Sequence, residues 1–125
     1  MHALPRLSGS TALFLDFDGT LVDIAAQPEL VHIPLQLPPL LQILHARLGS
    51  ALAIVTGRTI AEIDRFLAPL RLPIAGEHGA RRRGEAGILF AVDAPDLSPI
   101  TSAAQRLADQ HPGLRVERKE AAVAL

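Results

Sequence analysis

Two aspartates near the N-terminus are the residues in this 125-residue sequence that are best placed to do chemistry. Asp16 and Asp18 lie in the segment 16–20 (DFDGT), directly after an apolar run, and residues two apart on a strand project from the same face. Two like charges this close repel unless a cation or proton separates them, and Mg²⁺ prefers oxygen ligands. One carboxylate can then attack phosphorus while the other carries a proton. Gly19 is expected to turn the backbone beneath an anion and direct its N–H at it.

The aspartate pair also has a purely structural interpretation, because a polar turn commonly follows a buried strand. A second polar group favours the functional interpretation. Thr56, Gly57 and Arg58 follow the apolar run 51–55 and precede a predicted helix. A hydroxyl, an unobstructed backbone N–H and a guanidinium at a helix N-terminus suit a phosphoryl group. Since adjacent parallel strands end at one edge of a sheet, we expect Thr56 close to Asp16, although a lone threonine here is commonly a turn or cap residue.

Apolar runs separated by glycine and proline predict the elements that position these residues. Strands are expected over 11–17, 51–55 and 72–75, with helices over 40–48 and from Thr59 to about Pro69. Thr59 and Glu62 have the spacing of a capping box. Because 11–17 and 51–55 are continuous apolar runs, we expect both to be buried on their two faces. The alternation of strand and helix predicts an α/β fold with a doubly wound parallel sheet.

The pattern changes after residue 80. Strands over 81–83 and 88–92 are expected to pair across the glycine-containing turn 84–87, followed by a linker over 93–99. A helix is then predicted from residue 98 or 99 to 110, and two strands over 114–117 and 121–125. His78 lies between glycines and is expected to be a turn residue, while Glu77 is expected to orient the hinge or bind solvent.

Composition bounds the classes of function. Hydrophobic residues make up 49% and charged residues 20% of the chain, which is typical of a folded domain. The net charge of -1 argues against binding to a nucleic-acid backbone, and no apolar run approaches the roughly 20 residues of a membrane span. Cysteine is absent, and residues 1–6 lack the features of a signal peptide. We therefore expect a cytoplasmic domain with neither a nucleic-acid nor a membrane partner.

The motifs resemble those of the haloacid dehalogenase superfamily of phosphotransferases. The segment 16–21 (DFDGTL) and the residues 56–58 (TGR) are similar to the first two motifs of that superfamily. Within it, the segments 55–58 (VTGR), 76–80 (GEHGA) and 116–119 (VERK) resemble trehalose-6-phosphate phosphatases in their order and spacing. The resemblance runs from about residue 12 to residue 125.

The resemblance implies a role for each matching residue of the core. Asp16 would be the nucleophile and a ligand of Mg²⁺. Asp18 would be the general acid and base and would give the metal its backbone carbonyl. Thr56 and the Gly57 N–H would hold the phosphoryl oxygens, with Arg58 nearby.

The resemblance also divides the chain. Residues 1–95 match the N-terminal part of a Rossmann-like phosphatase core, and residues 96–125 match the first αββ unit of a cap domain. Glu117 and Lys119 fall at cap positions that would hydrogen-bond the hydroxyls of trehalose. Their spacing alone indicates only that both lie on one face of a strand, which is commonly a solvated face.

We therefore expect a Mg²⁺-dependent phosphatase that hydrolyses trehalose 6-phosphate to trehalose and phosphate through an aspartyl-phosphate, in trehalose biosynthesis. The superfamily also uses a later lysine and a later acidic motif. The single lysine here is Lys119, and only Glu120 and five apolar residues follow it. This pattern predicts a truncated enzyme that is inactive alone and has an exposed strand edge open to association.

Three alternatives stay open. One is another capped sugar-phosphate phosphatase, and a second is a non-catalytic fragment that binds phosphate or sugar. The third is a receiver-type signalling domain, which is disfavoured because its phosphoaccepting aspartate should end the strand 51–55, where no carboxylate occurs.

Overall fold

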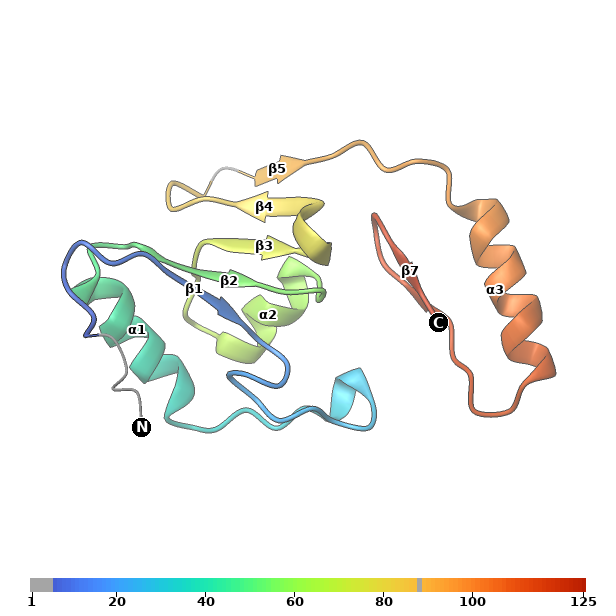
Figure 1. The fold of residues 1–125 in the computed structure, drawn as a ribbon, viewed down its shortest axis with the longest axis horizontal. Helices are drawn as coiled ribbons and strands as arrows, with labels where there is room; N and C mark the ends of the chain where they lie inside the picture. The colour runs from blue at the N-terminus through green and yellow to red at the C-terminus, as the bar shows by residue number, and fades with distance from the viewer. Residues whose placement is uncertain (1–5, 88) are drawn as a thin grey trace.

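A computed structural model describes residues 6–87 and 89–125 as a five-stranded mixed sheet, its helices and a separate two-stranded hairpin (Figure 1). The elements are β1 Leu13–Asp16, the 3-10 turn η1 Pro28–Leu30, α1 Leu37–Arg47, β2 Leu52–Val55, α2 Ile60–Leu67, β3 Ile74–Gly76, the 3-10 turn η2 Glu77–Gly79, β4 Arg81–Arg83, β5 Leu89–Ala91, α3 Ser98–Gln110, β6 Glu117–Arg118 and β7 Val123–Ala124. Residues 1–5 of the N-terminal segment and Ile88, the first residue of a predicted strand, lie outside the described residues.

The first three strands run parallel and bring the polar segments to one edge of the sheet. β1 pairs with β2 so that Asp16 lies opposite Val55, and β2 pairs with β3 so that Val55 lies opposite Ala75. The residues that follow each strand therefore meet at the same end. β3 begins at Ile74 rather than at residue 72, because the preceding Pro73 has no N–H to give to the ladder.

The predicted hairpin completes the sheet. β4 pairs antiparallel with β3 and with β5, and Arg82 lies opposite Phe90. The Gly87 N–H donates to the Gly84 carbonyl at 3.0 Å and closes the turn. The fold is thus α/β with a mixed sheet in the order β1-β2-β3-β4-β5.

The hydrophobic core lies on one face of this sheet. Both α1 and α2 pack there, on the inward side chains of the first three strands. The fully buried side chains are Phe17, Leu41, Leu52, Ile54 and Leu67.

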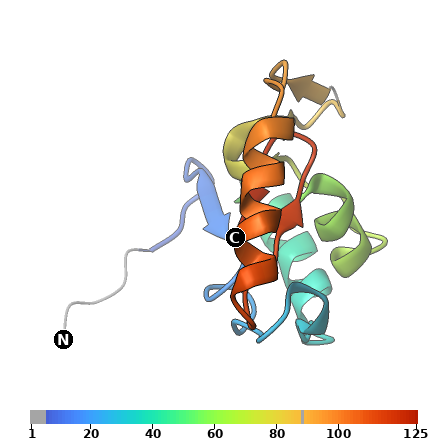
Figure 2. The same ribbon diagram turned by 90° about the vertical axis from the view of Figure 1, so that its right-hand side faces the viewer.

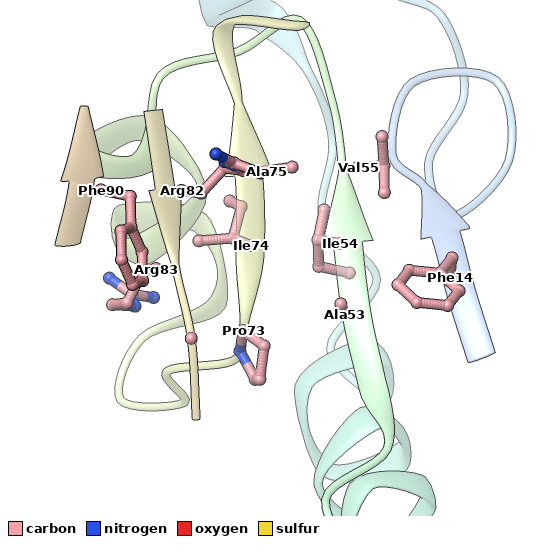
Figure 3. Close-up of a pocket in the computed structure, with 11 residues that line it drawn as sticks. Phe14, Ala53, Ile54, Val55, Pro73, Ile74, Ala75, Arg82, Arg83 and Phe90 are labelled. Atoms are coloured by element: carbon pink, nitrogen blue, oxygen red, sulfur yellow. The ribbon is translucent and has the colours of Figure 1, made fainter. Parts of the chain in front are cut away.

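The other face of the sheet is uncovered in the described part of the chain. Phe14 is 71% exposed, Val55 42% and Phe90 55%. Figure 3 shows these side chains with Ala75 and Arg82 along a shallow, largely apolar hollow. Among the described residues, β1 is also an edge strand and pairs with β2 alone.

The expectation that residues 11–17 and 51–55 are buried on both faces is therefore wrong for this chain. The strand order β1-β2-β3 advances in a single direction, and right-handed crossovers that advance in one direction place their helices on the same face. A second layer needs strands on the far side of β1, which the described residues do not supply.

The helices follow their sequence signals closely. α1 begins three residues before the predicted residue 40, because Pro38 and Pro39 are tolerated in a first turn whose N–H groups need no partner. α2 has the predicted capping box, in which the Glu62 N–H donates to the Thr59 hydroxyl and the Thr59 N–H donates to the Glu62 carboxylate. No helix among the described residues is both long and apolar enough to cross a membrane.

The C-terminal unit places a hairpin between α3 and the sheet (Figures 1 and 2). β6 and β7 are shorter than the predicted strands 114–117 and 121–125. Glu117 pairs with Ala124 and Arg118 with Val123. The hairpin is thus short, with two paired residues in each strand.

The one-sided core predicts opposite outcomes for two phenylalanines of β1 and the loop after it. Phe17→Ala removes a fully buried ring, and we expect the free energy of unfolding to fall by about 3–5 kcal/mol. Phe14→Ala, on the uncovered face, should change it by no more than about 0.5 kcal/mol. Urea unfolding followed by far-UV circular dichroism measures both. Equal losses for the two variants would contradict the assignment of the covered face.

Candidate active site

A polar pocket lies where the carboxyl ends of β1 and β2 meet the β6–β7 hairpin. Its lining contains seven of the eight residues that the sequence singled out, Asp16, Asp18, Thr56, Gly57, Arg58, Glu117 and Lys119, together with Ile24, Ala25, Pro28 and His78. Residues separated by up to a hundred positions in the sequence thus share one site. The eighth, Gly19, is not among the residues that line the pocket.

Asp16 ends β1, and its carboxylate has one hydrogen-bond donor among the described side chains. The Thr20 hydroxyl donates to Asp16 Oδ2 at 3.1 Å. Gly19 has the left-handed φ of +82° that the turn requires, but its N–H donates to the Val22 carbonyl at 2.7 Å. The backbone turn beneath the site therefore exists, while the expected Gly19 N–H contact to a phosphoryl oxygen stays a prediction that needs this bond to break.

Arg58 donates two parallel hydrogen bonds to the Asp18 carboxylate. Arg58 Nε donates to Asp18 Oδ2 at 2.8 Å, and Nη2 donates to Oδ1 at 2.7 Å. The third nitrogen, Nη1, donates to the Pro28 carbonyl at 2.9 Å. The hydrogen bonds that Arg58 donates to Asp18 raise the pKa of its guanidinium, against the opposing effect of burial. Arg58 thus orients the expected acid and base.

Aromatic rings and a second carboxylate hold Arg58 in place. Its guanidinium carbon lies 5.2 Å from the centre of the Phe66 ring and 5.9 Å from that of Phe17. Glu62, one turn further along α2, lies 3.6 Å from Nη1. The sequence placed Arg58 near the phosphoryl group, but its direct partner here is Asp18. Only the spacing of the two motifs hinted at this pair.

The loop after β2 packs directly on the turn after β3. The Glu77 N–H donates to the Arg58 carbonyl at 2.9 Å, and the His78 N–H donates to the Thr56 carbonyl at 3.1 Å. A Cβ on Gly57 would lie 2.6 Å from the His78 ring, so any other residue there would displace that ring. His78, which the sequence suggested as a turn residue, therefore forms part of the pocket wall as well.

Thr56 is buried, with 4% of its surface exposed, and already has backbone partners. Its N–H donates to the Ala75 carbonyl, and its hydroxyl oxygen accepts from the Arg58 N–H at 3.1 Å. Because a hydroxyl that accepts can still donate, Thr56 Oγ1 retains a proton to offer an anion in the pocket.

The hairpin residues close the pocket from the opposite side. Lys119 Nζ donates to the Gly57 carbonyl at 2.6 Å and lies 3.6 Å from the Glu117 carboxylate. The Lys119 side chain is only 10% exposed. The solvated strand face that spacing alone indicated is therefore wrong for Lys119, because the hairpin folds back onto the loop after β2.

The oxygen atoms near Asp16 fit a divalent cation in part. The Asp16 carboxylate and the Asp18 backbone carbonyl are the donors that could hold Mg²⁺, which commonly binds through one or two carboxylates plus phosphate oxygens and water. The Asp18 carboxylate is occupied by Arg58. No group of three His, Cys, Asp or Glu side chains with metal-binding geometry occurs in the described residues. A complete site needs ligands from the substrate, water or further chain.

The sequence model of the trehalose-phosphatase family matches residues 14–125. The chain belongs to the trehalose-phosphatase family. It is 42% identical over 125 residues to a probable trehalose-phosphate phosphatase of Sinorhizobium fredii, covering 99% of this chain and 47% of that protein. It is 38% identical over 123 residues to the trehalose-6-phosphate phosphatase of Escherichia coli, covering 97% of this chain and 46% of that protein.

A solved structure of a trehalose-6-phosphate phosphatase related protein has the same fold as this trehalose-phosphatase chain. The TM-score is 0.72 at 35% identity, over 90% of this chain and 50% of that one. The fold and family expected from the motifs are thus confirmed. The chain spans about half the length of the relatives that it matches.

The two parallel hydrogen bonds from Arg58 to Asp18 predict that lysine cannot replace this arginine without a loss of stability. We expect Arg58→Lys to lower the free energy of unfolding by about 1–3 kcal/mol, because an ammonium keeps the charge but loses the two parallel bonds and the bond to Pro28. Arg71→Lys is the matched control, since Arg71 is 75% exposed and lies 3.9 Å from Asp64. It should cost no more than about 0.5 kcal/mol. Similar losses in urea unfolding would contradict the structural role of the pair.

Proposed function

We propose that this site hydrolyses the phosphate ester of a sugar, namely trehalose 6-phosphate, to trehalose and phosphate, as a step of trehalose biosynthesis. One observation carries the proposal. The two carboxylates of the first motif and the Thr56–Gly57 loop line one pocket at the carboxyl ends of parallel strands, in a chain of the trehalose-phosphatase family. Because a phosphorylated sugar does not cross membranes unaided, we place the reaction in the cytoplasm.

Asp16 is the nucleophile in this scheme. An oxygen of its carboxylate attacks phosphorus, the bond from phosphorus to the sugar oxygen breaks, and an aspartyl-phosphate forms. For this step Asp18 carries a proton on an oxygen freed from Arg58, and it gives that proton to the departing sugar oxygen. Water then attacks phosphorus, Asp18 takes a proton from it, and the bond from phosphorus to Asp16 breaks to release phosphate.

The loop after β2 binds the group in transfer. The Thr56 hydroxyl and the Gly57 N–H supply hydrogen bonds to the phosphoryl oxygens, as donors fixed before the reaction begins. The Asp16 carboxylate and the Asp18 backbone carbonyl would hold Mg²⁺, which when bound would supply positive charge to those oxygens. Glu117 and Lys119, on the hairpin that faces these donors, hydrogen-bond the sugar hydroxyls.

We propose that the 125 residues alone turn over little substrate. Phosphoryl transfer needs a cation at the equatorial oxygens. The only lysine of the chain, Lys119, is engaged by Gly57 and Glu117 on the hairpin side. The relatives are about twice as long, so their further residues can supply both a cation and an acidic ligand.

The uncovered face of the sheet suits those further residues. β1 has an unpaired edge in the described part of the chain, and Phe14 on β1, Val55 on β2 and Phe90 on β5 lie exposed across this face. We propose that the occupant of this face is the part of a trehalose-phosphatase chain that these residues do not match. A parallel strand beside β1 followed by a helix would continue the sheet and cover the apolar hollow.

Reconstitution tests the activity. The chain is mixed with Mg²⁺ and the part of the Sinorhizobium fredii relative that it does not match, and phosphate release from trehalose 6-phosphate is measured. We expect turnover in the mixture and little in the chain alone. Asp16→Asn should lower turnover by about 10⁴-fold or more. Asp23→Asn, an exposed neighbour outside the pocket, is the matched control. Undiminished turnover of Asp16→Asn would remove Asp16 from the nucleophile's role.

Sedimentation of the same mixture tests the docking face. We expect a one-to-one complex, and Phe14→Lys should abolish it because a charge then meets an apolar partner. Leu35→Lys changes an even more exposed apolar residue away from this face and should leave the complex intact. A complex that survives Phe14→Lys, or no complex with the unmodified chain, would contradict the proposed interface.

A further inference from the structure

Glu77 is a buried carboxylate for which the reaction scheme has no use. Only 3% of its surface is exposed, and it belongs to η2, at the end of β3. In the described part of the chain, its carboxylate accepts one hydrogen bond, from the Ala121 N–H at 2.7 Å. A buried carboxylate with so little compensation is costly, so this contact calls for an explanation.

The backbone around Glu77 is held in an uncommon conformation. Glu77 and His78 have φ values of +49° and +56°, in the left-handed region that residues other than glycine rarely occupy. Both N–H groups donate to carbonyls of the loop after β2, at Arg58 and Thr56. The turn that aims the Glu77 side chain is thereby tied to the loop that borders the phosphate pocket.

The donor, Ala121, lies in the turn of the β6–β7 hairpin. The Lys119 N–H donates to the Ala122 carbonyl at 2.9 Å and closes this turn. Lys119 Nζ reaches the Gly57 carbonyl at 2.6 Å, and Glu120 lies 3.2 Å from Arg81. The hairpin turn thus meets the core at three points, of which the Glu77 contact is buried and the Glu120 contact is exposed.

We propose that Glu77 is a positioning residue, which fixes the hairpin turn against the core so that Glu117 and Lys119 stand over Asp16. It acts through the Ala121 N–H and touches no reacting atom. Its placement of the hairpin follows from the contacts above, while its value for sugar recognition rests on the function proposed for the site. When the bond breaks, the hairpin turn keeps only its Lys119 and Glu120 contacts with the core among the described residues, and the pocket opens on that side.

Electron–electron distance measurement between two spin labels tests the placement without any enzyme assay. The chain has no cysteine, so Gln42→Cys on α1 and Ala103→Cys on α3, both exposed, take the labels specifically. We expect one narrow distance in the otherwise unmodified chain. Glu77→Ala should lose it in favour of a broad distribution with longer distances. Glu77→Gln should keep it, because the amide oxygen still accepts from Ala121.

Glu120→Ala is the matched control. It removes the exposed contact of the same turn, where the carboxylate is 71% exposed, and should leave the narrow distance in place. A Glu77→Ala distribution identical to that of the unmodified chain would overturn the proposal. So would a broad distribution in Glu77→Gln, since charge rather than hydrogen bonding would then hold the hairpin.

Hydrogen exchange at the Ala121 amide keeps the proposal testable if Glu77→Ala fails to fold. In the unmodified chain we expect exchange at least about tenfold slower than at the same residue in an unstructured peptide of residues 113–125, because the bond must open first. Exchange at the unstructured rate would overturn the proposal. Neither measurement involves catalysis, so loss of the proposed phosphatase function leaves their outcomes unaffected.

Discussion

The close packing of two backbone loops at one edge of the sheet is the constraint on which the site depends. The turn after β3 donates two hydrogen bonds to the loop after β2, and glycine is required at Gly76, where the two backbones touch. A Cβ on Gly76 would lie 2.9 Å from the Arg58 carbonyl oxygen. This contact fixes the backbone that presents Thr56 and Gly57, and it aims Arg58 at Asp18. The hairpin then closes on the same two loops.

The strand order explains both the position of the pocket and the uncovered face of the sheet. Three parallel strands in the order β1-β2-β3 bring their carboxyl ends together, which places Asp16, Asp18 and the loop of Thr56 and Gly57 around one pocket. The same order places both helices on one face. The uncovered face is therefore a direct consequence of this strand order among the described residues.

Much of the core was predictable from sequence because its signals are local. Apolar runs, the capping box of Thr59 and Glu62, and the motif at Asp16 each act within a few residues. Contacts between distant segments were not predictable in this way. The bidentate bond from Arg58 to Asp18 spans forty positions, and the burial of Lys119 depends on where the hairpin folds back. The one-sided core could not be predicted either, because a continuous apolar run does not show whether helices cover one face of the sheet or both.

Phosphopeptide mapping tests the central claim, that Asp16 carries the phosphoryl group. The reconstituted enzyme is quenched in acid during turnover of trehalose 6-phosphate, digested, and analysed by mass spectrometry for the mass of one added phosphoryl group. The account predicts this mass on Asp16 and its absence from the Asp16→Asn variant. A phosphoryl group on any other residue, or none during turnover, would contradict it.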